Sequence, residues 1–340
     1  MQEEVRRAAE RLRALGGDPG DPAALADQPY LVAQLAGDLA LDRGVRYDLV
    51  GLADAAGIGT SRAAELLGVL GIDPPEPGVV RFTDDDVAVL RTIVDAPARW
   101  VREQEVAELL RVIGRTMATT AEASIAYHLR SIEPHVHDLA DWVDANHEMA
   151  TLSRQLGAQL GPIYRHHLRQ AIDLQRSVNA GAGRGEILDV AVAFVDLSGF
   201  TGMSLDLDLV GLGDVVTRLD VLATDAARAH RSRVVKLIGD EAMFVGADPA
   251  NLVGAAWQFI DAIGGEDIDA HGALTYGRVT MNQGDYFGPV VNLAARLVDH
   301  AGPGELLGDA AVAQAVTAEP AGTREVRGLP DPVPVYRLSR

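Results

Sequence analysis

Hydrophobic residues recur at three- and four-residue spacing through most of residues 1–178. This period predicts amphipathic helices. We expect them over 3–15, 84–96, 101–129, 138–156 and 163–180. Glycine and proline at 16–22 and 73–78 interrupt the pattern, because neither residue favours continuation of a helix. The segment 181-GAGRG-185 is typical of a junction, so we predict an all-α domain over 1–180 and a second domain over 181–340.

The pattern changes after Glu186. An apolar run over 187–196 predicts a strand at the centre of a sheet, and residues 233–247 contain two β-rich runs joined at Gly239 and Asp240. Further helices and strands are expected at 208–229, 249–263, 270–279, 289–301, 305–308 and 323–338. The order β-α-β-β-α-β predicts an α+β fold with a ferredoxin-like sheet.

Composition narrows the classes of protein. The net charge of −19 disfavours non-specific binding to nucleic acid or to an acidic membrane surface. The chain has no cysteine, which excludes disulfides and cysteine-based zinc sites. No run of 18 apolar residues and no signal-peptide pattern is present. We therefore expect a cytoplasmic protein that does not span a membrane.

Two carboxylates are candidates for a metal site. Asp196 ends the predicted first strand and Asp240 lies at the hairpin tip. In a βαββαβ sheet these elements are neighbours, and two close carboxylates repel unless a cation such as Mg²⁺ or Mn²⁺ lies between them. The turn Ser198–Thr201 would offer backbone N–H groups to a phosphate. Each aspartate taken alone is more often a turn or cap residue, so a structural role stays open.

Asn292 and Arg296 are four residues apart in a predicted helix and share one face. An amide and a guanidinium side by side suit a negative charge that develops on phosphorus. A surface arginine beside an asparagine is an equal alternative for this helix alone.

Three ordered motifs together resemble class III adenylyl cyclases: FVDLSGFT (194–201), VKLIGDEAMFV (235–245) and GDYFGPVVNLAARL (284–297). The resemblance covers residues 187–340. It implies that Asp196 and Asp240 hold two Mg²⁺ or Mn²⁺ ions per active site, with the carbonyl of Leu197 as an extra ligand. It also implies that Phe200 and Thr201 bind phosphate through their backbone.

The same resemblance assigns the remaining roles. Lys236 and Asp285 would read the purine through N1 and the 6-amino group, which favours ATP over GTP. Asn292 and Arg296 would orient the ribose and stabilise the transition state. The implied reaction is attack of the ribose 3′-hydroxyl on the α-phosphorus, which releases pyrophosphate. Because the family shares its site between two catalytic domains, one complete set of residues implies a homodimer.

The C-terminal segment departs from the family, which often has a lysine there for the terminal phosphates. Arg327 is our candidate for that role, although Leu329 also falls near the lysine's place.

The helical half is similar to the autoinhibitory, pH-responsive modules of soluble bacterial class III cyclases. Histidine changes charge near neutrality, and most of the histidines lie in this half: His128, His135, His137, His147, His166 and His167. We predict that protonation of His166 and His167 acts on the catalytic domain through their helix. Solvated surface histidines are an equal alternative.

Residues 50–72 resemble a helix-turn-helix, but the second helix has only Arg62 as a basic residue. Structural packing is therefore favoured over DNA binding. Three rival functions stay open: a catalytically silent nucleotide-binding regulator, a DNA-binding regulator and a guanylyl cyclase.

Overall fold

The computed structural model describes residues 2–20, 28, 30–96, 102–178, 187–200, 202, 207–264 and 269–340. The chain divides into two compact units, Met1–His166 and His167–Arg340. Helix α9 (Leu160–Val178) crosses this division in sequence. The predicted junction at 181–185 lies outside the described residues.

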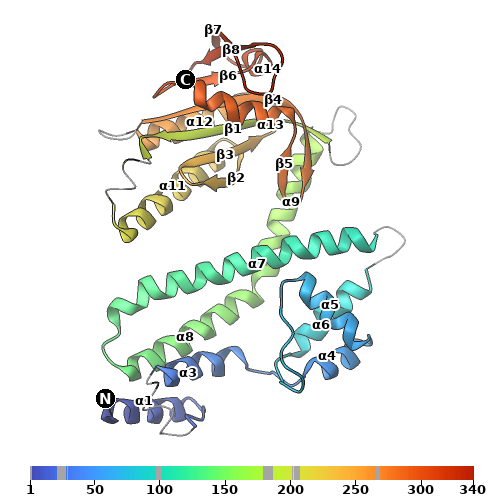
Figure 1. Cartoon of the computed structure of the whole chain (residues 1–340), viewed down its shortest axis with the longest axis vertical. Helices are drawn as coiled ribbons and strands as arrows, with labels where there is room; N and C mark the ends of the chain where they lie inside the picture. Colours follow the sequence, from blue (N-terminus) through green and yellow to red (C-terminus); the bar gives the residue numbers. More distant parts are fainter. Residues whose placement is uncertain are drawn as a thin grey trace. The chain divides into compact units, whose positions relative to one another are not determined.

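The first unit is built from helices, as the spacing of its apolar residues predicts (Figure 1). Its helices are α1 (Gln2–Ala14), α3 (Leu31–Leu41), α4 (Leu49–Ala56), α5 (Thr60–Val69), α6 (Asp84–Val94), α7 (Glu103–Ile132) and α8 (Leu139–Ala158), with a short 3-10 turn η1 (Glu133–His135). One core joins α1, α3 and α8, and a second joins α4, α5, α6 and the first part of α7.

The segment 50–72 does form a helix-turn-helix, from α4 and α5. Gly57 makes the turn with a φ of 74°, in the left-handed region that glycine adopts without cost. Arg62, the basic residue of α5, pairs with Glu65 at 2.7 Å and also with Glu103. The guanidinium that a DNA phosphate would need is therefore already paired with two carboxylates.

The second unit holds an eight-stranded sheet with strand order β2-β3-β1-β4-β6-β8-β7, and β5 pairs with β4. Its elements are β1 (Ile187–Ser198), α11 (Leu209–Ala229), β2 (Arg233–Ile238), β3 (Glu241–Gly246), α12 (Pro249–Ile263), β4 (Asp269–Asn282), β5 (Asp285–Phe287), α13 (Pro289–Leu297), η2 (Val298–His300), β6 (Leu306–Gly308), α14 (Ala310–Ala313), β7 (Ala318–Arg324) and β8 (Val333–Leu338). The first four strands have the ferredoxin-like order, so the predicted α+β class and βαββαβ core are confirmed.

The side chains of β1 alternate between two cores, one on each face of the sheet. Odd-numbered residues such as Val195 pack under α11 and α12. Even-numbered residues such as Phe194 pack with α13. Because the period of a strand is two, Asp196 faces the α13 side of the sheet.

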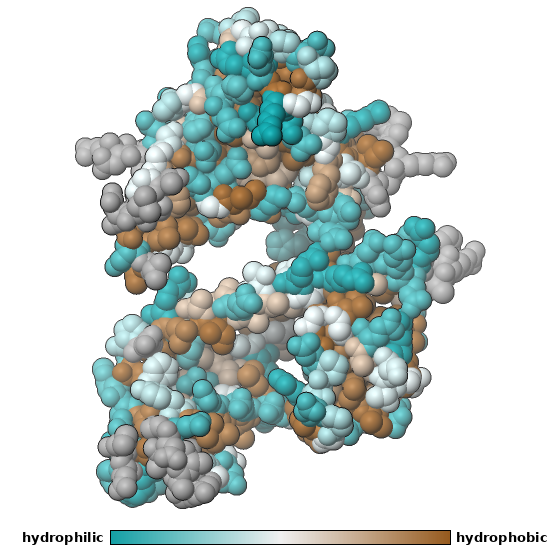
Figure 2. Space-filling model, viewed as in Figure 1, coloured by the Kyte–Doolittle hydropathy of each residue, from teal (hydrophilic) through white to brown (hydrophobic). Residues whose placement is uncertain are grey.

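None of the described helices is long and apolar enough to cross a membrane. Hydrophilic side chains cover most of the visible surface in Figure 2, and the apolar ones form separate patches.

Candidate active site

Asp196 lies where the pairing of β1 changes. The strand continues two residues beyond the predicted end, to Ser198, because β4 pairs with it as far as Asp269. Pairing with β3 stops at Val195, opposite Ala242. Asp196 therefore lacks a paired neighbour on its β3 side, and a third of its side chain is exposed.

Asp240 occupies the predicted two-residue turn between β2 and β3, which the pairing of Ile238 with Glu241 confirms. Gly239 has a φ of 67° at the first turn position, as a hairpin turn that begins with glycine requires. Burial raises the pKa of Asp196, and the charge of Asp240 is the next largest cause. The structure thus brings together the two aspartates that were predicted as metal ligands.

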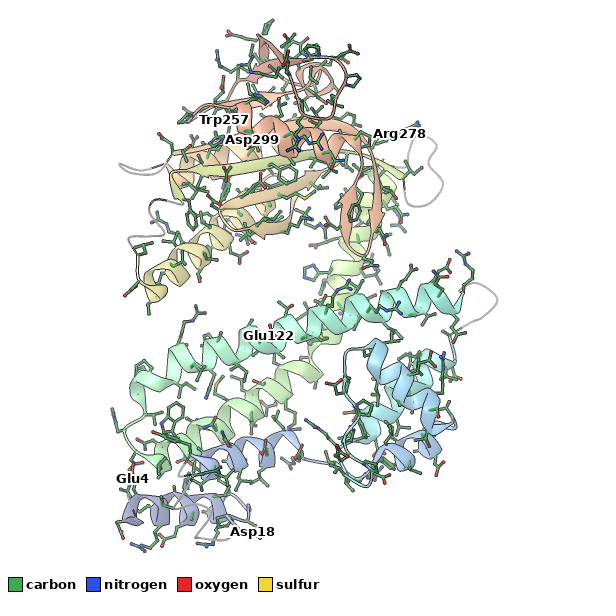
Figure 3. The ribbon with its side chains drawn as sticks, viewed as in Figure 1. Glu4, Asp18, Glu122, Trp257, Arg278 and Asp299 are labelled. Atoms are coloured by element: carbon green, nitrogen blue, oxygen red, sulfur yellow. The ribbon has the colours of Figure 1, made fainter. Side chains whose placement is uncertain are left out.

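Two further carboxylates, not singled out from the sequence, join this pair. Glu241 is half-buried and lies on the α13 face of the sheet. Burial raises the pKa of Glu241 to about 7, and the charge of Asp196 is the next largest cause. Asp299 adds to the same shift; it lies in η2, just after α13 (Figure 3). Glu241 directly follows Asp240 at the start of an apolar strand, and that position could have indicated it.

His271 lies beside the carboxylates, on the neighbouring strand β4. It pairs with Asp196 across β1 and β4, and its Nε2 lies 4.0 Å from a carboxylate oxygen of Asp196. Its Nδ1 lies 3.0 Å from the hydroxyl of Ser198. These contacts orient the imidazole beside the carboxylates.

Oxygen donors dominate this corner, and oxygen is the ligand type that Mg²⁺ and Mn²⁺ prefer. Among the described residues, no three His, Cys, Asp or Glu side chains are arranged to hold a metal ion by themselves. A site there would use the two aspartates and a backbone oxygen. The side chain of Leu197 is buried in the core, so its carbonyl is the group that it could supply.

The predicted phosphate turn is described only in part. Gly199 has a φ of 84°, and the Phe200 side chain packs against the core under α11 and α12. Only the backbone of Phe200 is then left for a phosphate. Thr201 lies outside the described residues.

Lys236 on β2 and Asp285 on β5 meet on the α13 side of the sheet. The ammonium nitrogen lies 2.5 Å from a carboxylate oxygen, and both side chains are partly open to solvent. The backbone N–H of Tyr286 also donates to Asp285, at 2.8 Å. The structure therefore places the two predicted purine contacts side by side.

Helix α13 presents Asn292 and Arg296 to solvent. The Arg296 guanidinium donates to the backbone carbonyl of Arg327. Arg327 and Leu329 are both exposed and lie in the segment between β7 and β8. Among the described residues, neither Asn292 nor Arg296 forms a hydrogen bond or ion pair with the acidic group around Asp196.

No family model matches the chain. It is 34% identical over 323 residues to the uncharacterized protein Rv2212 of Mycobacterium tuberculosis. The aligned region covers 89% of this chain and 82% of that protein. It is also 30% identical over 294 residues to the pH-sensitive adenylate cyclase MT1302 of Mycobacterium tuberculosis. That alignment covers 77% of this chain and 72% of the relative.

Among solved structures, the adenylyl cyclase CyaB from P. aeruginosa is similar to the chain. It shares 21% of residues, covers 46% of this chain and 95% of its own, and has a TM-score of 0.41.

Proposed function

This chain belongs to the class III adenylate cyclase family, and we propose that it converts ATP to 3′,5′-cyclic AMP and pyrophosphate. Nucleotide cyclase activity follows from the family. The observation that carries the choice of ATP is the pair formed by Lys236 and Asp285. The lysine donates and suits the acceptor N1 of adenine, and the aspartate accepts and suits the 6-amino group. Guanine presents the opposite polarity at both positions.

Asp196 and Asp240, with the carbonyl of Leu197, would hold Mg²⁺ or Mn²⁺. The raised pKa of Asp196 supports this, because its second cause is a like charge that a cation would offset. When bound, the ions would supply positive charge beside the phosphates of ATP and lower the pKa of the ribose 3′-hydroxyl. The backbone of Phe200 and Thr201 would bind phosphate on the adjacent turn.

Residues of α13 and of the β7–β8 segment would complete the site. Asn292 would orient the ribose, and Arg296 would stabilise charge on the α-phosphate. The guanidinium of Arg296 now donates to a neutral carbonyl, which a phosphate oxygen would replace with a stronger, charge-assisted bond. The exposed Arg327 would bind the terminal phosphates.

A homodimer is part of the same proposal. Within the described part of one chain, neither Asn292 nor Arg296 forms a hydrogen bond or ion pair with the carboxylates around Asp196. A second copy would bring Asn292 and Arg296 to the carboxylates across a two-fold axis. Two equivalent sites would result, each built from both subunits.

Control by pH through the helical half is also proposed. A relative is named a pH-sensitive adenylate cyclase, and the histidines differ in surroundings. His166 and His167 are exposed on α9, which matches the solvated alternative within one chain. His128 of α7 is instead buried, and neither ring nitrogen has a hydrogen-bond partner among the described residues. Protonation of His128 would therefore disturb the packing of the helical unit.

The test is cyclic AMP formation by the purified full-length protein with Mn²⁺ and ATP, beside two variants. Asp240→Asn keeps the shape of the side chain but removes its charge, and we expect a loss of at least about 100-fold in kcat. Asp220→Asn changes an exposed aspartate of α11 and should leave the rate unchanged. Equal activity of both variants would exclude the metal role of Asp240. Absence of turnover in the wild type would favour a nucleotide-binding regulator.

A further inference from the structure

We propose that the contact between Arg233 and Tyr286, here called the clamp, positions Lys236 and Asp285 for binding of the purine base. The inference rests on the proposed function, in which Lys236 and Asp285 contact the base. Arg233 lies on the same strand as the lysine, and Tyr286 directly follows the aspartate. The clamp and the pair are therefore two neighbouring links between β2 and β5.

A β-bulge makes the two links possible. Arg233 and Lys236 are three residues apart, a spacing that places side chains on opposite faces of a regular strand. Here Arg233 pairs with Val245 and Lys236 pairs with Met243, and the register shifts at Val235. Because these partners are two residues apart on β3 and share the core under α13, both cations face the same side.

Tyr286 is the fixed end of the clamp. It is only 2% exposed and belongs to the core under α13. Arg233 donates to its hydroxyl at 3.3 Å, and the guanidinium carbon lies 5.5 Å from the ring centre. Within 6 Å of the centre, a cation is attracted by the ring face. The tyrosine N–H also donates to the Asp285 carboxylate at 2.8 Å, so its position sets that of the aspartate.

The two strands need such a link. β2 is an edge strand, and β5 has three residues that pair with β4. The ion pair of Lys236 with Asp285 is 40% and 29% exposed, and an exposed pair is worth little by itself because water screens it. A buried tyrosine held by an arginine offers a firmer reference point, so the spacing of donor and acceptor at the base depends on the clamp.

The test compares kcat and KM for ATP and for GTP in the full-length protein and its variants. Arg233→Ala removes the clamp, Tyr286→Phe removes the hydroxyl and keeps the ring, and Arg233→Lys keeps a cation over the ring. Arg228→Ala is the matched control. Arg228 is an 82% exposed arginine of α11, paired with Asp225, and α11 covers the opposite face of the sheet.

We expect Arg233→Ala to raise KM for ATP about tenfold and to lower the ATP-to-GTP preference by a similar factor, with kcat changed less than about twofold. Tyr286→Phe should have a smaller effect, Arg233→Lys should restore most of the preference, and Arg228→Ala should match the wild type. Equal losses with both nucleotides, or a loss confined to kcat, would overturn the positioning role. A wild type that turns over neither nucleotide would instead overturn the proposed function, and the clamp with it.

Discussion

Lys236 and Asp285, which are 49 residues apart in sequence, lie with their charged groups at 2.5 Å. One donates and the other accepts at the same corner of the sheet. This polarity matches the N1 and 6-amino positions of adenine. The pair therefore sets the substrate in our account, while the carboxylates near Asp196 and the helix α13 carry out the reaction.

Exchange of the donor and the acceptor at this pair should reverse the preference for ATP over GTP. The double variant Lys236→Glu with Asp285→Asn places an acceptor where guanine has N1–H and a donor where it has O6. Two corrected hydrogen bonds should shift the GTP-to-ATP ratio of kcat/KM by about 100-fold. Steady-state rates with each nucleotide measure this ratio, with the Arg228→Ala variant as control. An unchanged ratio would mean that other residues read the base.

The shared site predicts that two inactive variants complement each other. Asp240→Asn and Arg296→Ala should each lose nearly all cyclase activity alone. After co-expression, half of the dimers should be mixed, and each mixed dimer should keep one intact site of two, for about a quarter of wild-type activity. A mixture of Asp240→Asn with Asp196→Asn, which damage the same half-site, should show no recovery. Recovery in neither mixture would argue for a site within one chain.

Gly288 fixes the start of α13. Its φ is 153°, and an added Cβ would lie 3.0 Å from the carbonyl oxygen of Arg278. Gly288→Ala should therefore destabilise the protein by about 1–3 kcal/mol and displace Asn292 and Arg296, with a loss of kcat. Gly213→Ala, in α11 with open space around it, should instead leave activity intact and raise stability by about 0.5–1 kcal/mol. Thermal unfolding and initial rates report both effects.

His128 predicts a pH-dependent stability. Burial lowers the pKa of His128 below the usual 6.5, and the side chain of Asn146 opposes that shift. The amide nitrogen of Asn146 donates to the Trp142 carbonyl at 2.9 Å. Because the unfolded chain takes up the proton first, the stability due to neutral His128 is full above about pH 6.5 and is lost as the pH falls through that value toward the folded pKa.

The measurement is Tm between pH 7.5 and pH 5 for the wild type, His128→Leu and His166→Gln. His128→Leu should flatten the acid side of the curve, because it removes the group that gains a proton on unfolding. His166→Gln, at an exposed site, should follow the wild type. Parallel curves for all three proteins would exclude His128 as the source of acid sensitivity.

Local patterns were sufficient to predict the core of the fold. The apolar run of β1, the glycine turn at Gly239 and the helical spacing of α12 each depend on neighbours in sequence. The end of β1 was predicted two residues early because a carboxylate at position 196 looks like a strand end. Pairing with β4 extends the strand to Ser198, and that long-range contact leaves no local signal.

The site residues that belong to a sequence motif were predictable, whereas the residues that strand register brings to the site were not. Motif positions indicated Asp196 and Asp240. His271 lies beside them only through the pairing of β1 with β4, whereas Glu241 directly follows Asp240 in the chain. The bulge at Val235, which turns Arg233 toward Tyr286, cannot be read from the β2 sequence, since each of its residues fits a regular strand.

The most direct measurement of the central claim is a competition experiment. Purified full-length wild type would be given equal ATP and GTP with Mn²⁺, and cyclic AMP and cyclic GMP would be quantified in the same reaction by mass spectrometry. The account predicts that cyclic AMP forms in at least about tenfold excess. An excess of cyclic GMP, or the absence of both products, would contradict it.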